Sequence, residues 1–323
     1  MKRVFLIFNR ASGRHRNRRE EQISGIVSIF HSHGIQVEVC ATTHAGSAMD
    51  QTRQAADGGF DTVIACGGDG TAHEALNGLM RASTQAVLGV VPLGSGNVLA
   101  TDLLLPKNPL LAAQALLRYE PRPLRPGVIR YQDKSGPRER YFIVTAGVGL
   151  DAELMYRTAV EVKDRYGVNA YFLEMLRMAR RGKFPMFQVE WLDEQGIRHR
   201  EKASLVLAVR TRKFPGLLRR ARLGAELARN DFRLMLFQTH QVWRFINYFA
   251  SVASGWNWKV PKVELAFSTG FRCVADDSGE ADAIHCEADG ELLGVLPVEV
   301  CMGPKSFHLL MPPAPAHGNS VIS

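Results

Sequence analysis

The sequence contains no apolar run long enough to cross a membrane. A membrane-spanning helix needs about 20 apolar residues in succession, and the 323 residues offer only shorter stretches. The apolar core at 4–8 is too brief for a secretory signal peptide, and Asn9 and Arg10 follow it at once. We therefore expect a cytoplasmic protein that does not span the membrane.

Cysteine is also scarce, with five residues and no Cys-x-x-Cys spacing. This scarcity argues against a zinc site and against a disulfide framework. Two of the five stand inside apolar runs, which predicts small buried thiols in a reducing compartment. The five are Cys40, Cys66, Cys273, Cys286 and Cys301.

Acidic residues are the minority charge, since 32 Asp and Glu against 40 Lys and Arg leave a net charge of +8. In two segments, 176–184 and 210–224, basic residues alternate with Leu, Met and Phe. This mixture suits an anionic membrane surface. A solvated basic face without a partner is the alternative. No recognisable docking element for nucleic acid accompanies the charge, so we expect no nucleic-acid partner.

Strand-like and helical patterns alternate over the first third of the chain. Such alternation predicts a mostly parallel sheet with helices on both faces, and ligands then lie beyond the carboxyl ends of the strands. The strand candidates are 3–9, 36–42, 62–66 and 86–94, and the helix candidates are 17–34, 46–57, 71–82 and 97–104.

The pattern changes at the proline-containing stretch 119–131. Strand-like runs separated by turn residues dominate thereafter, as antiparallel sheets require, with helices expected near 167–181 and 241–254. This predicts an α/β domain, a β-rich domain with a cleft between the two, and a Pro-rich tail of disordered composition. The predicted divisions are 1–125 for the α/β domain, completed by 304–315, then 126–303 for the β-rich domain and 312–323 for the tail.

Two glycine-rich loops follow neighbouring strand candidates. The first glycine loop, GGDGT at 67–71, and the second glycine loop, GSGN at 94–97, each end an apolar run and open a helical pattern. Glycine lets a ligand approach the backbone, and N–H groups at a helix start favour an anion such as phosphate. Asn9, Ser12 and Gly13 offer a polar turn to the same edge, so together these features predict a phosphate site.

Acidic residues accompany the glycines in two places. Asp69 lies within the first glycine loop, where a carboxylate repels phosphate unless it holds a metal or takes a proton. Asp289 and Glu291 flank a glycine far along the chain, a pattern that by itself indicates a hairpin turn. Beside the first loop, we expect Glu74 to interact with the positive end of the helix and His73 to pack or face solvent.

Five motifs, taken in order, resemble the diacylglycerol kinase catalytic superfamily, which includes bacterial soluble lipid kinases and the sphingosine kinases. They are an opening N-x-x-S-G, then GGDGT, PLGSGN, GVGLDA and a late DGE, and they extend from Arg3 to Met311. The resemblance implies an ATP-dependent kinase that phosphorylates a hydroxyl of a membrane lipid such as diacylglycerol or a sphingoid base, with Mg²⁺. It also implies a nucleotide-binding α/β domain, a β-sandwich-like lipid domain and a location peripheral to the membrane, and it leaves a homodimer open.

The resemblance assigns roles to individual residues as well. Asp69 matches an aspartate implicated in catalysis, and Asp289 and Glu291 match a late acidic pair beside the nucleotide. Asp151 matches an aspartate near the lipid head group. The matching ATP-binding positions are Asn9, Ser12, Gly13, Thr42, Gly67, Gly68, Gly70, Thr71, Ser95, Gly96, Asn97 and Arg165.

Phosphoryl transfer suits these roles, because it needs ATP and acceptor in line, neutralised phosphate charge and a base at the attacking hydroxyl. Asp69 would serve as that base or as a Mg²⁺ ligand through water, with Asp289 or Glu291 in the other role. We favour Asp69 as the base because it stands where the γ-phosphate should end. The stretch ARNDFRL, which contains Asp231, lacks a glycine and one acid of the family's acidic turn, and this weakens the case for a structural metal there.

Two alternatives accompany this hypothesis. An NAD kinase shares a GGDG loop and a two-domain plan, although PLGSGNVLATDL suits the lipid kinases better. A catalytically silent regulator that binds lipid or nucleotide is the second alternative, and the presence of Asp69, Asp289 and Glu291 argues against it.

Overall fold

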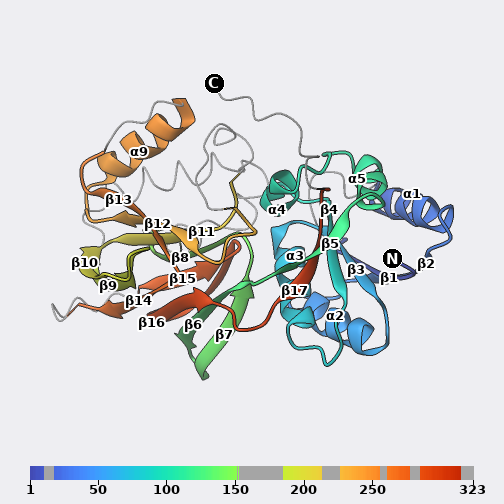
Figure 1. Ribbon diagram of the computed structural model, residues 1–323, viewed down its shortest axis with the longest axis horizontal. Coiled ribbons are helices and arrows are strands. Elements are labelled where there is room, and N and C mark those ends of the chain that lie inside the picture. Colours follow the sequence, from blue (N-terminus) through green and yellow to red (C-terminus); the bar gives the residue numbers. More distant parts are fainter. Residues whose placement is uncertain are drawn as a thin grey trace.

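The computed structural model describes residues 1–10, 18–150, 152, 185–212, 226–254, 260–276 and 284–313. The strands within these residues form two hydrogen-bonded sheets that lie beside each other (Figure 1). None of the helices in these ranges combines the length and the apolar character needed to span a membrane.

The first sheet contains six strands in the order β2-β1-β3-β4-β17-β5. All pairs are parallel except that of β17 with β5. Figure 1 shows β17, in red, among the strands of the N-terminal half, so the far end of the chain returns to this sheet. The bounds are β1 (Arg3–Phe8), β2 (Gln36–Ala41), β3 (Thr62–Gly67), β4 (Val87–Pro92), β5 (Glu120–Leu124) and β17 (Phe307–Met311).

Helices cover both faces of this sheet because the direction of the crossovers reverses after β2. Right-handed crossovers then place α1 on one face and α2 and α3 on the other. The packing agrees, since α1 contacts α5 whereas α2 contacts α3. The reversal puts the switch point of the sheet, where ligands of such folds bind, between β1 and β3. The bounds are α1 (Arg19–His31), α2 (Ser47–Asp57), α3 (Asp69–Leu79), α4 (Val98–Asp102) and α5 (Pro109–Leu116).

The second sheet contains eleven antiparallel strands. Its main path is β10-β9-β14-β16-β15-β8-β11-β12-β13, and β6 joins β16 to β7. The sheet curls, so that Phe142 of β7 stacks on Phe232 of β12, with ring centroids 5.6 Å apart, although these strands are not neighbours. The bounds are β6 (Gly127–Asp133), β7 (Gly136–Phe142), β8 (Thr145–Gly149), β9 (Phe187–Leu192), β10 (Arg198–Ala203), β11 (Leu205–Val209), β12 (Phe232–Phe237), β13 (Val263–Ser268), β14 (Gly270–Ala275), β15 (His285–Ala288) and β16 (Glu291–Met302), and helix α9 spans Val242–Ser254.

The predicted fold class is confirmed, with an α/β domain of parallel strands and a second, β-rich domain. The proline-containing stretch, expected to be a connection, holds strand β5, whose position at the sheet edge tolerates Pro121 and Pro123. The segment 140–147 contains the end of β7 and the start of β8. The helix expected at 167–181 lies outside the described residues.

Candidate active site

The two glycine loops lie against each other at the carboxyl ends of β3 and β4. The N–H groups of Leu93 and Gly94 both donate to the carbonyl of Gly67, at 2.8 and 3.2 Å. A Cβ atom on Gly94 would lie 2.4 Å from the Cα of Gly68, so no larger residue fits there without moving the loops apart. Asn97 closes the second glycine loop, because its Oδ1 accepts from the N–H of Gly94 at 2.9 Å and its Nδ2 donates to the carbonyl of Gly94 at 2.6 Å.

Asp69 begins α3, but its carboxylate is directed at α4. Its Oδ2 accepts from the N–H of Val98 at 3.0 Å, and its Oδ1 accepts from the N–H of Leu99 at 3.1 Å. The first N–H groups of a helix lack partners within the helix, so Asp69 caps α4 and ties the two glycine loops together. Burial raises the pKa of Asp69, while these N–H groups oppose the rise and the charge of Asp289 adds to it.

The remaining positions of the loops differ in what they offer a ligand. Ser95 and Gly96 are exposed at the tip of the second glycine loop. Thr71 is buried instead, and its Oγ1 would lie 2.2 Å from a Cβ atom on Gly67. The Thr71 side chain therefore packs beneath the first glycine loop, whereas Ser95 and Gly96 are accessible.

Asn9 and Thr42 lie at the same edge of the sheet. The N–H of Asn9 donates to the carbonyl of Cys66 at 3.3 Å, and the N–H of Thr42 donates to that of Phe8 at 2.9 Å. The other predicted site residues lie outside the described part of the chain; they are Ser12, Gly13, Asp151 and Arg165.

The turn between β15 and β16, residues 287–291, brings acids of the second sheet to the first. We call these residues the acidic turn. Asp289 and Gly290 adopt φ values of +49° and +86°, the left-handed region that Asp and Gly tolerate in hairpin turns. The hairpin indicated by the sequence is therefore present. The buried Asp289 carboxylate accepts three N–H groups, from Ile143 at 2.9 Å, Val144 at 2.7 Å and Thr145 at 3.0 Å.

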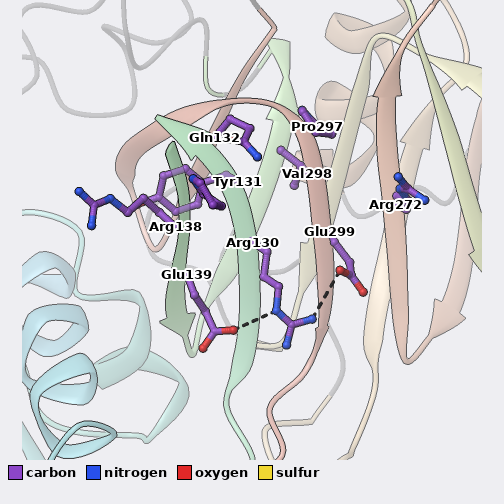
Figure 2. A pocket seen from close by; sticks show the side chains of 10 residues that line it. Arg130, Tyr131, Gln132, Arg138, Glu139, Arg272, Pro297, Val298 and Glu299 are labelled. Atoms are coloured by element: carbon purple, nitrogen blue, oxygen red, sulfur yellow. Dashed lines mark hydrogen bonds and ion pairs between the residues drawn. The ribbon is translucent and has the colours of Figure 1, made fainter. Parts of the chain in front are cut away.

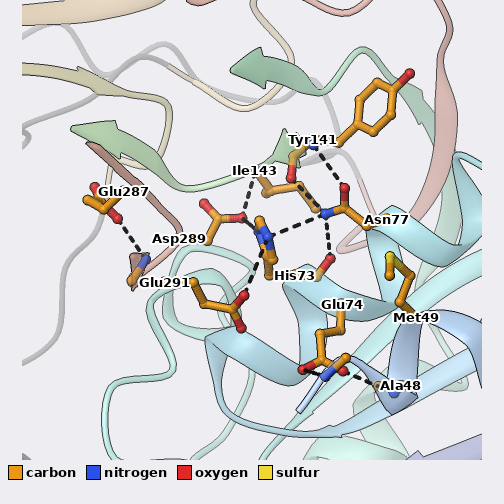
Figure 3. A network of polar contacts seen from close by, with 12 residues as sticks. Ala48, Met49, His73, Glu74, Asn77, Tyr141, Ile143, Glu287, Asp289 and Glu291 are labelled. Atoms are coloured by element: carbon orange, nitrogen blue, oxygen red, sulfur yellow. Dashed lines mark hydrogen bonds and ion pairs between the residues drawn. The ribbon is translucent and has the colours of Figure 1, made fainter. Parts of the chain in front are cut away.

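His73 of α3 meets this turn from the other side. Its Nδ1 lies 3.2 Å from Oδ2 of Asp289, and its Nε2 lies 3.8 Å from Oε2 of Glu291 (Figure 3). The imidazole is buried, in keeping with the expectation that it packs, but it packs against carboxylates. Burial alone would lower the pKa of His73; the hydrogen bond and charge of Asp289, with the charge of Glu291, outweigh burial and raise it.

Glu291 differs from the other two acids because its carboxylate remains accessible. Its side chain is 34% exposed, and among the described contacts no peptide N–H donates to it. Its Oε1 lies 3.0 Å from the position that a Cβ atom on Gly70 would take, so the carboxylate stands directly beside the first glycine loop. Burial raises the pKa of Glu291, His73 opposes the rise, and Glu74 and Asp289 add to it.

Two residues that the sequence did not single out, Asn77 and Glu287, support the contact between α3 and the second sheet. The amide of Asn77 pairs with the backbone of Tyr141 in both directions, accepting at 3.0 Å and donating at 2.9 Å. The buried Glu287 accepts from the N–H of Gly290 at 2.9 Å and so braces the acidic turn. Their partners come from distant parts of the chain or from backbone groups, which no sequence motif reveals.

Glu74 caps a helix, but not the one on which it stands. Its carboxylate accepts from the N–H groups of Gly46 at 2.8 Å and Ala48 at 3.0 Å, at the start of α2. The expectation that Glu74 interacts with a positive helix end is therefore correct for α2 rather than for α3.

The basic segments are described only in part. Residues 176–184 and 213–224 lie outside the described residues. Arg210 is fully buried, and its guanidinium donates to the carbonyls of Arg125 at 2.6 Å and Leu227 at 3.1 Å. Arg210 therefore stabilises the interior and does not face a membrane.

A separate hollow of about 590 Å³ lies over β6, β7, β14 and β16 (Figure 2). Arg130 in its centre pairs with Glu139 at 2.9 Å and with Glu299 at 3.5 Å. These carboxylates neutralise Arg130, so this hollow is a poorer phosphate site than the glycine loops.

No group of three or more His, Cys, Asp and Glu within the described ranges is arranged to hold a metal ion. Asp231 lies in the stretch ARNDFRL, which was compared above with a possible structural metal site. Its carboxylate accepts from Nε of Arg229 at 2.8 Å. Its carboxylate is therefore engaged in an ion pair.

In a comparison with protein families, residues 3–129 match the diacylglycerol kinase catalytic domain. This N-terminal part of the chain is thus similar to the diacylglycerol kinase catalytic domain. It is 28% identical over 315 residues to a diacylglycerol kinase of Bacillus subtilis, across 97% of both chains. It is also 34% identical over 142 residues, 43% of each chain, to a probable lipid kinase YegS-like of Chromohalobacter salexigens. These relatives support a lipid kinase.

Solved structures resemble this chain in fold. A diacylglycerol kinase from Bacillus anthracis superposes with a TM-score of 0.68 at 15% identity, over 97% of both chains. Yeast NADH kinase, solved with NADH, gives a TM-score of 0.51 at 10% identity, over 96% of this chain and 83% of that one. The two-domain fold is thus shared more widely than the sequence motifs.

Proposed function

We propose that this chain is an ATP-dependent lipid kinase, which transfers the γ-phosphate of ATP to a hydroxyl of a membrane lipid such as diacylglycerol or a sphingoid base. The observation that carries the proposal is the position of Glu291, whose carboxylate from the second sheet stands beside Gly70 of the first glycine loop. The backbone that would bind phosphate and the accessible carboxylate of Glu291, which would act as the base, therefore lie next to each other. The printed names of the Bacillus subtilis and Chromohalobacter salexigens relatives support the same activity.

The two glycine loops would bind the phosphates of ATP. Their peptide N–H groups lie at the carboxyl ends of β3 and β4, next to the switch point of the sheet. The start of α3 adds a favourable dipole for an anion. Asn9 and Thr42, at the same edge, would meet the rest of the nucleotide.

The contacts favour Glu291 over Asp69 as the base. Asp69 already accepts from two N–H groups of α4, whereas the Glu291 carboxylate is partly exposed. A glutamate whose pKa is raised by burial is also a better proton acceptor at neutral pH. In the step we propose, the lipid oxygen attacks the γ-phosphorus and gives its proton to Glu291. The bond between the γ-phosphorus and the β–γ bridging oxygen breaks, and ADP leaves.

Mg²⁺, when bound with ATP, neutralises charge on the phosphates and helps orient them. The carboxylates of Asp69 and Asp289 fit this ion poorly, because both oxygens of each already accept peptide N–H groups. Mg²⁺ commonly retains water and phosphate oxygens as ligands, and we expect these to provide most of its coordination here.

A lipid kinase must also reach its substrate at a membrane. We propose a cytoplasmic protein that binds the surface of an anionic membrane through segments 176–184 and 210–224, apart from Arg210, which is buried. On α9, Trp243 is exposed and has Arg244 over its ring at 5.1 Å, which suits the same surface.

The test is transfer of label from γ-labelled ATP with Mg²⁺ to a panel of lipids in mixed micelles, with NAD as a soluble acceptor. Glu291→Gln is measured beside the wild type. Glu299→Gln, an exposed exchange on the same strand, serves as the matched control. Labelled lipid that is lost with Glu291→Gln but kept with Glu299→Gln supports the proposal and names the lipid. Label in NADP would establish the NAD kinase alternative, and label in neither acceptor would favour a silent binding protein.

A further inference from the structure

Helix α3 holds the second sheet through two side chains on one face. His73 and Asn77 lie four residues apart, one helical turn, and both are buried. Asn77 binds the backbone of Tyr141 on β7, while His73 binds the acidic turn (Figure 3). The helix that begins at the first glycine loop is therefore attached directly to the strand and turn of the second sheet.

The hydrogen bonds of Asn77 indicate which partner each ring nitrogen of His73 has. The two amide hydrogens of Asn77 are used by the carbonyls of His73 and Tyr141, each at 2.9 Å. The 3.4 Å approach of the Asn77 amide nitrogen to Nε2 of His73 is therefore not a donated bond. On the other ring nitrogen, Nδ1 donates to Asp289, since that carboxylate can only accept. Nε2 is left to face Glu291.

We propose that His73 is a positioning residue, which holds the Glu291 carboxylate beside Gly70 through Nε2 while Nδ1 anchors the ring on Asp289. The inference rests on the proposed function, because it assigns a task to His73 only if Glu291 is the base. The charges around Glu291 support it. Asp289 and Glu74 repel this carboxylate, and the cations that face it are His73 and Arg140. Of these two, His73 is fixed by a hydrogen bond to the same turn.

Two substitutions of His73 distinguish the roles of its two ring nitrogens. The amide nitrogen of Asn occupies approximately the place of Nδ1, and that of Gln approximately the place of Nε2. His73→Asn keeps a donor for Asp289 and loses the group that faces Glu291, whereas His73→Gln keeps the latter. We expect His73→Asn to lower kcat by about 100-fold, the scale of a misplaced reacting group, with KM for ATP unchanged. His73→Gln should restore most of that loss, and His33→Asn, at an exposed position after α1, is the control for the exchange.

The outcomes are distinguishable from a failure of the proposed function. If the wild type labels a lipid and His73→Asn retains the wild-type kcat, the positioning role is wrong and the lipid kinase stands. An equal loss in the Asn and Gln variants would likewise overturn it, since that result indicates a general packing role. If the variants do not fold, or if the wild type labels no lipid, ¹⁵N-histidine NMR of the wild type and of Glu291→Gln provides the test. We expect the pKa of His73 to fall when the Glu291 charge is removed, and an unchanged titration would contradict the contact.

Discussion

The glycine loops of the first sheet and the acidic turn of the second build the site in opposite ways. In the glycine loops, the absence of a Cβ atom lets the backbone of Gly94 lie against that of Gly68. The acidic turn contributes carboxylates, and a buried histidine and several peptide N–H groups hold them. The two elements meet where the Glu291 carboxylate stands beside Gly70, and the proposed function depends on this contact.

Asp69 and Glu291 show the same contrast at the level of single residues. Burial raises the pKa of both carboxyl groups. Asp69 has its oxygens bound by the start of α4, whereas Glu291 keeps its carboxylate accessible next to Gly70. This difference in contacts is the reason for which we propose Glu291, and not Asp69, as the base.

The largest expected effect is on turnover, and it separates these two acids. Glu291→Gln should lower kcat by about 10²- to 10⁴-fold, the usual contribution of a general base, with little change in ATP affinity. Steady-state kinetics at saturating lipid measures kcat, and calorimetry measures the affinity for ATP. A wild-type kcat in Glu291→Gln would contradict the proposal that Glu291 is the base.

The next effect concerns the contact between the glycine loops. Gly94→Ala places a Cβ atom 2.4 Å from the Cα of Gly68, and overpacking of this kind costs about 1–3 kcal/mol. We expect the free energy of unfolding to fall by that amount, and ATP affinity to fall with it as the loops separate. Urea denaturation and calorimetry measure both. Gln85→Ala, at an exposed position before β4, is the control, and an equal result for the two variants would show that the loops are not in close contact.

A smaller effect distinguishes the cap from the base. Asp69→Asn loses one of the two oxygens that cap α4, and loss of a helix cap costs about 1 kcal/mol. The variant should be less stable to urea, while Glu291→Gln should not, because burial already disfavours the charged form of Glu291. The reverse order of stabilities would contradict the roles given to the two acids.

The smallest effect is a pH dependence of stability at His73. Because its folded pKa is raised, its contribution is complete below the unfolded pKa of about 6.5 and is lost as pH rises through the folded value. The difference in unfolding free energy between the wild type and His73→Asn should therefore shrink as pH increases. Urea denaturation at several pH values, with His33→Asn as reference, measures this difference. A difference that stays constant would mean that His73 is not charged in the fold.

The sequence predicted the elements of the site better than their assembly. Alternating strands and helices, with glycines where two strands end, located both loops at one edge, because local pattern and parallel topology determine that edge. The roles of Asp69 and His73 were not predictable in the same way. Asp69 caps a helix 29 residues away, and His73 binds a turn 216 residues away. Such partners follow from the packing of the two sheets.

The direct test of the central claim, that Glu291 accepts the lipid proton, is the pH profile of kcat/KM for lipid phosphorylation in neutral micelles. Glu291 must be deprotonated to act, and burial holds its pKa above the ordinary value. The rate should therefore fall on the acid side with an apparent pKa above about 4.3, the value for an unperturbed glutamate. The residual activity of Glu291→Gln should lack that limb. The same acid limb in Glu291→Gln would contradict the claim and assign the proton to another group.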